Sequence, residues 1–79
     1  MDLTNEEKKS IAMQHAKGTM INLFNLEMSL AEENAVDNPD KSTIDNINKQ
    51  MAEFQKKLDA MTAEINSLDA AIAAEQTQG

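Results

Sequence analysis

The sequence has 79 residues, which is enough for one small domain whose core alone is a weak source of stability. It contains no Cys, which excludes disulfides, thiolate metal sites and cysteine nucleophiles. Its net charge of −7 disfavours direct binding to nucleic acid or to anionic lipid, and two Phe without Trp or Tyr leave few platforms on which bases stack.

The N-terminal residues have no basic stretch leading into an apolar one, so they do not have the pattern of a secretory signal. No segment approaches the roughly 20 apolar residues of a membrane span. We therefore expect a soluble protein, cytoplasmic or, if it is of viral origin, associated with a virion.

The first predicted element is a helix over residues 5–35. Thr4 followed by Glu7 fits the capping box of a helix N-terminus, and good helix formers dominate the segment. With about 100° between successive residues, the apolar side chains cover an arc of roughly 180° rather than one narrow line. One edge of the arc holds Ala12, Ala16, Leu23 and Leu30, its middle Met13, Met20, Phe24 and Ala31, and its other edge Ile21, Met28 and Ala35, with Leu26 widening it.

Two single residues in this helix have alternative interpretations. Gly18 costs about 1 kcal/mol relative to Ala inside a helix. It is either a hinge or point of close helix approach, or a tolerated glycine. His15 is the sole histidine, and the residue three positions before it is Ala12 rather than a carboxylate, so we interpret it as a surface residue and not as a metal ligand.

Residues 36–42 are predicted to form a turn. Pro39 disfavours helix at Asn38, and the surrounding Asp and Asn residues suit turns. The segment lacks the glycine and terminal glutamate of a calcium-binding EF-hand loop. Ser42 followed by Asp45 is a weaker capping signal for a second helix over residues 43–75, after which the polar tail 76–79 is expected to fray.

The second helix has the most regular pattern in the sequence. Large apolar residues recur in alternating steps of three and four, which predicts a heptad seam and a left-handed coiled coil. Acid–base pairs four residues apart, Asp45 with Lys49 and Glu53 with Lys57, are expected to add about 0.2–0.5 kcal/mol each. The predicted seam residues are Ile44, Ile47, Met51, Phe54, Leu58, Met61, Ile65, Leu68 and Ile72.

A short turn predicts that the two helices pack as an antiparallel hairpin in which residue numbers of opposite residues add to about 78. This register pairs Phe24 with Phe54, Met20 with Leu58, and Leu30 with Ile47. The seam of the second helix would then be used up, while the first helix keeps apolar surface for a partner. The predicted interface residues are Met20, Ile21, Leu23, Phe24, Leu26, Met28 and Leu30.

The predicted fold is therefore an all-α antiparallel helical hairpin. We expect it to dimerise into an antiparallel four-helix bundle or to receive a helix of another protein. By architecture alone such a hairpin resembles small secretion chaperones and small bacteriophage assembly or virion components, although no motif ties the sequence to either.

Three functions follow as hypotheses. The first is a non-enzymatic assembly, adaptor or chaperone-like module that binds helices, with a small bacteriophage structural or assembly component as one form of it. The second is an acidic inhibitor of a nucleic-acid-binding protein, supported only by the charge. The third, an enzyme, is disfavoured because no nucleophile, phosphate loop, cofactor site or metal site is recognisable.

Overall fold

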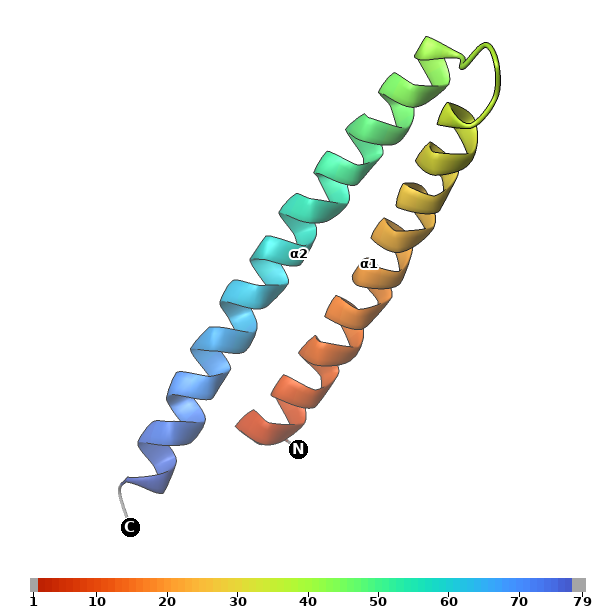
Figure 1. The fold of residues 1–79 in the computed structure, drawn as a ribbon. Coiled ribbons are helices and arrows are strands. Elements are labelled where there is room, and N and C mark those ends of the chain that lie inside the picture. The colour runs from red at the N-terminus through yellow and green to blue at the C-terminus, as the bar shows by residue number, and fades with distance from the viewer. Residues whose placement is uncertain (1, 78–79) are drawn as a thin grey trace.

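The chain forms a two-helix hairpin in the computed structural model, which describes residues 2–77. Helix α1 (Asn5–Asn34) and helix α2 (Lys41–Gln76) run antiparallel, side by side, and make a rod of 64 × 19 × 16 Å (Figure 1). The all-helical hairpin is thus confirmed; α1 begins at the predicted residue, and the other helix ends lie one or two residues from the predicted ones. Of the predicted frayed tail, Gln76 ends α2 and Thr77 caps it, and residues 78–79 lie outside the described residues.

The start of α1 is fixed by the predicted capping box. The Thr4 side-chain oxygen accepts a hydrogen bond from the Glu7 backbone N–H at 3.1 Å, and the Glu7 carboxylate accepts one from the Thr4 backbone N–H at 2.9 Å. The second bond lowers the pKa of the Glu7 carboxyl below its ordinary value, with the Thr4 hydroxyl contributing in the same direction. Two backbone donors that the helix leaves unpaired are satisfied in this way.

The turn between the helices is closed by two carboxylates. Asp40, and not Ser42 as predicted, caps α2: it accepts hydrogen bonds from the Ser42 backbone N–H at 3.3 Å and from the Thr43 hydroxyl at 2.6 Å. Asp40 follows Pro39 directly, where an extended residue with a short acceptor side chain suits an N-cap. Glu33, in the last turn of α1, accepts from the Asp40 backbone N–H at 2.9 Å and so links the two helix ends.

The nine predicted seam residues of α2 are all buried or half-buried. Ile47 and Leu68 are the most covered, each 9% exposed. The residues between them on the other sides of α2 are mostly exposed and polar. Large apolar side chains at steps of three and four therefore form one continuous line along the whole helix, and that line is the covered one.

The covered line of α1 differs from the expected one. Covered positions again recur in steps of three and four, but in the N-terminal half they are small or polar, and leucines appear only toward the turn. Phe24 and Met20, which were expected to meet Phe54 and Leu58, point away from α2 and are 59% and 50% exposed. The covered residues of this line are Asn5, Lys9, Ala12, Ala16, Thr19, Leu23, Leu26, Leu30 and Glu33.

The expected pairing of Phe24 and Met20 with α2 was wrong for an electrostatic reason. Their row on the helix also contains Lys17 and Glu27, and turning it toward α2 would press both charges against apolar side chains. The row that contains Leu23 instead presents only uncharged residues along the middle of α1.

The predicted register, in contrast, is confirmed by three contacts between the helices. The Lys9 ammonium lies 2.6 Å from the Asp69 carboxylate. The Asn5 amide donates to Glu75 at 2.6 Å, and the Thr19 hydroxyl lies 3.6 Å from the sulfur of Met61. The residue numbers of these partners add to between 78 and 80, close to the predicted value of about 78.

The hairpin has a thin core. Among residues 2–77, the buried apolar side chains are Ala16, Ile47 and Leu68, and Thr19 is the one buried polar residue. The Thr19 hydroxyl donates to the His15 carbonyl oxygen at 3.2 Å, so its burial leaves no polar atom without a partner. Two helices in contact along one line leave most of each helix uncovered.

Charged side chains on the outside contribute little further stabilisation. In the described part of the chain, Lys9–Asp69 is the one ion pair within 4 Å, so the pairs expected within α2 are not formed. The Lys57 ammonium lies instead 5.3 Å from the centre of the Phe54 ring, a cation–π distance.

Candidate interaction surface

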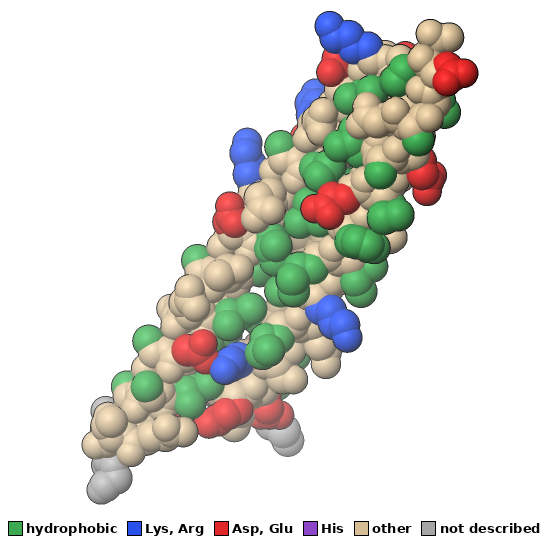
Figure 2. All heavy atoms as spheres, in the orientation of Figure 1, with side chains coloured by type: hydrophobic (Ala, Val, Ile, Leu, Met, Phe, Trp, Pro, Cys, Tyr) green, Lys and Arg blue, Asp and Glu red, His purple; other side chains and the backbone are tan. Residues whose placement is uncertain are grey.

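An apolar surface runs along α1 on a side that does not contact α2. Its five members are each about half exposed, whereas large apolar side chains of α2 are covered. On the face drawn in Figure 2, hydrophobic side chains gather over the middle of the hairpin, with single charged side chains between them. We call this surface the outer face of α1; it consists of Met13, Met20, Ile21, Phe24 and Met28.

The outer face is distinct from the line that packs on α2. At about 100° per residue, the two are turned about 120° apart around the helix axis. Three of the seven predicted interface residues, Leu23, Leu26 and Leu30, are half-buried on the α2 side. The other four belong to the outer face, to which the structure adds Met13.

Helix α2 does not extend this surface. The positions of α2 that flank its covered line on the same side are polar and exposed: Asn48, Gln55, Thr62 and Asp69. Among residues 2–77, no large apolar side chain of α2 is exposed, so a partner that covers the outer face finds its exposed large apolar side chains on α1.

Two opposite charges interrupt the outer face at regular intervals. Lys17 lies between Met13 and Met20, and Glu27 lies one turn beyond Phe24; both are exposed and neither has an ion-pair partner within 4 Å among residues 2–77. The sequence interpretation did not single them out. The signal was present, because positions 13, 17, 20, 24, 27 and 31 follow alternating steps of four and three, as a second helix-contacting line would.

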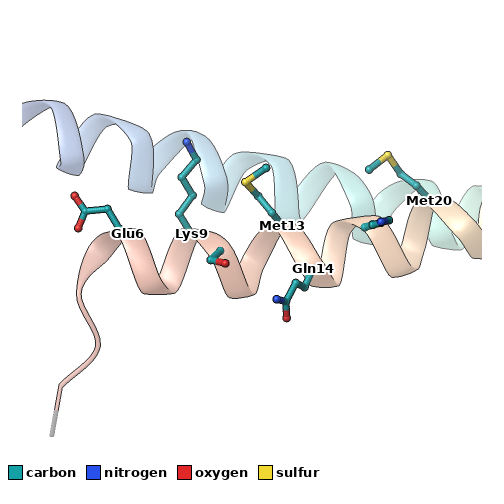
Figure 3. A pocket seen from close by; sticks show the side chains of 7 residues that line it. Glu6, Lys9, Met13, Gln14 and Met20 are labelled. Atoms are coloured by element: carbon teal, nitrogen blue, oxygen red, sulfur yellow. The ribbon is translucent and has the colours of Figure 1, made fainter.

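A shallow surface hollow lies in the N-terminal half of the outer face. Figure 3 shows Met13 and Met20 projecting on the same side of α1, with Gln14 pointing away and Lys9 reaching toward α2. The hollow has a volume of about 610 Å³, and every residue that lines it comes from α1: Glu6, Lys9, Ser10, Met13, Gln14, Lys17 and Met20. It is a depression between side chains of one helix, of a kind that one large side chain of a partner can enter.

The two single residues of uncertain role both lie away from the outer face. A Cβ atom built on Gly18 meets no other atom within 4 Å, so no close helix approach requires a glycine here, and α1 continues through it. His15 is exposed. Within residues 2–77, no three His, Cys, Asp or Glu side chains lie close enough together to hold a metal ion.

Neither helix, as far as residues 2–77 extend, combines the length and the apolar character that crossing a bilayer requires. Comparisons of the chain with protein-family models, with curated proteins and with solved structures give no match. The outer face of α1 is accordingly the feature on which a functional inference must rest.

Proposed function

We propose that this protein is a non-enzymatic, helix-binding module that works in an assembly, adaptor or chaperone-like role. The observation that carries the proposal is the outer face of α1. Five large apolar side chains, each about half exposed, stand on one side of a helix whose other side already packs on α2. A group of large apolar side chains exposed on one side of a helix marks a site of protein contact.

The shape of the surface indicates the kind of partner. The exposed side chains follow the helix over four turns, from Met13 to Met28, with polar residues on both flanks. An elongated apolar stripe along one helix suits a second helix, whose side chains at steps of three and four residues would pack against it. Methionine contributes three of the five side chains, and its flexible thioether adapts to the shape of what packs against it.

The proposal is tested by recovering the chain from its native host under conditions that keep complexes intact, with two matched variants. Phe24→Glu places a charge in the middle of the outer face. Ile11→Glu makes the same kind of change at an exposed apolar residue on the other side of α1. We expect the parent chain and Ile11→Glu to be recovered in a complex whose size exceeds that of the single chain, and Phe24→Glu to be recovered alone.

Circular dichroism of both variants establishes that the helices are still formed. Recovery of the parent as a single chain, or equal recovery of a complex with both variants, would count against a binding role for the outer face.

A further inference from the structure

We propose that the partner covering the outer face of α1 is a second copy of the chain, packed with its own α1 antiparallel to the first around a two-fold axis near residue 22. The inference rests on the proposed function, because it names the occupant of the same surface. Four observations carry it: the spacing of the outer positions, the placement of two opposite charges, the hollow beside Met20, and the polar flank of α2.

The spacing provides a line that two helices can share. Positions 10, 13, 17, 20, 24, 27, 31 and 34 alternate in steps of three and four, as along the line that faces α2. Two such lines placed antiparallel bring residues opposite each other whose numbers add to a constant. A two-fold axis makes the contact self-complementary, so that each pair occurs twice.

The charges select one register. When the constant is 44, Lys17 lies opposite Glu27 of the second copy, and Met20 lies opposite Phe24. Sliding the second copy along the first by seven residues in one direction places Lys17 opposite Met20 of the other copy. Sliding it by seven residues in the other direction places Glu27 opposite Phe24 of the other copy. Both shifts take a charge out of water without a partner, and only the register centred on residue 22 pairs the charges.

A parallel arrangement is disfavoured by the same two residues. In a parallel pair about a two-fold axis, Lys17 meets Lys17 and Glu27 meets Glu27. Like charges opposite each other at an interface are repulsive, and the antiparallel arrangement turns both contacts into attractive ones.

The apolar side chains and the hollow fit this register. Phe24 of the second copy lies level with Met20, at the edge of the hollow lined by Met13, Lys17 and Met20 (Figure 3). Among residues 2–77, Phe24 is the most exposed of the large apolar side chains, and an aromatic ring is the largest apolar group that the chain offers to such a hollow. Ile21 lies beside the two-fold axis, next to Ile21 of the other copy.

The polar flank of α2 leaves the two α1 helices at the centre of the dimer. The four helices then form a bundle in which each α2 packs on its own α1 and the central contact is made by α1 with α1. The contact from residue 13 to residue 31 is about 27 Å long at 1.5 Å per residue.

The test is a charge-reversal cycle followed by analytical ultracentrifugation of the full chain at about 0.15 M salt. Lys17→Glu and Glu27→Lys each turn two attractive contacts into two repulsive ones, and we expect each to weaken dimerisation roughly tenfold or more. The double variant has the same net charge as the parent and restores the pairs with reversed sign, so it should dimerise about as well as the parent.

Lys56→Glu and Glu53→Lys, at exposed positions of α2, are the matched controls and should leave the dimer unchanged. A parent chain that is monomeric at the highest attainable concentration overturns the proposal. So does a dimer for which the double variant does not recover the affinity lost by the single ones. In either case the proposed function remains open to its own test, because that test substitutes Phe24 and does not involve the charge pair.

Discussion

Thr4 and Glu7 show how local hydrogen bonds decide where α1 begins. Each residue accepts a bond from the backbone N–H of the other, at 3.1 and 2.9 Å. The pattern is short and has a direct physical cause, so it could be found in the sequence. The cap of α2 was harder to assign, because Asp40, Ser42 and Thr43 are all residue types that can cap a helix. In the structure, Asp40 is the cap, directly after Pro39.

The lowered pKa of Glu7 predicts an acid-sensitive contribution to stability. The pKa of this carboxyl is lower in the folded chain than in the unfolded one, so its stabilising effect is present above the ordinary Glu pKa of about 4.3 and is lost as the pH falls through the lower, folded value. We expect the stability difference between the parent and Glu7→Gln to shrink as the pH is lowered from 6 to 3.

Urea unfolding at a series of pH values measures this difference. Glu6→Gln removes a carboxylate from the same helical turn but leaves the bonds between Thr4 and Glu7 in place, and so serves as the control. A difference for Glu7→Gln that does not change with pH would contradict the assignment.

Gly18 is the second residue with a definite expectation. Its backbone is helical, and an added Cβ has open space around it. Gly18→Ala should raise the free energy of unfolding by about 0.5–1 kcal/mol, because alanine favours the helix and loses less conformational freedom on folding. Thermal unfolding by circular dichroism tests this, and a decrease in stability would show that the glycine has a role that the hairpin alone does not reveal.

At the scale of the helices, α2 could be predicted from sequence and the orientation of α1 could not. All nine large apolar residues of the α2 seam are covered, so the period of this helix is visible in the sequence. The covered line of α1 contains Ala12, Ala16 and Thr19, with Lys9 near one end and Glu33 at the other, and its period is hidden. The large apolar residues of α1 lie mostly on its outer face, so their pattern predicts that face, and not the one that packs on α2, as the contact with α2.

The two faces of α1 predict different effects of two similar truncations. Leu26 is half-buried on the α2 side, and Met28 is 46% exposed on the outer face. Leu26→Ala should destabilise the hairpin by about 1–2 kcal/mol, which is less than full burial would give, and Met28→Ala should change it by less than about 0.5 kcal/mol. Urea unfolding at low micromolar concentration compares the two, and a larger loss for Met28→Ala would mean that the faces are assigned the wrong way round.

For the molecule as a whole, the thin core and the outer face are two aspects of one arrangement. Two helices in contact along a single line bury only Ala16, Ile47, Leu68 and Thr19 among the described residues. The sequence already implied that α1 has more apolar surface than α2 covers. It could not show which residues remain outside, since that depends on how α1 is rotated against its neighbour.

The arrangement of two copies can be read from the dimensions of the particle. The single hairpin is 64 Å long, and residue 22 of α1 lies close to the middle of its length. Two hairpins joined side by side about that residue should have twice the mass but a longest dimension of only about 70 Å, because each copy overlaps the other almost completely. Copies joined end to end would reach about 130 Å, twice the length of one rod. Small-angle X-ray scattering combined with light scattering distinguishes the two arrangements, and Phe24→Glu should return both the mass and the cross-section to those of one hairpin. A long dimer, or a compact one that Phe24→Glu leaves intact, would place the contact somewhere other than the outer face of α1.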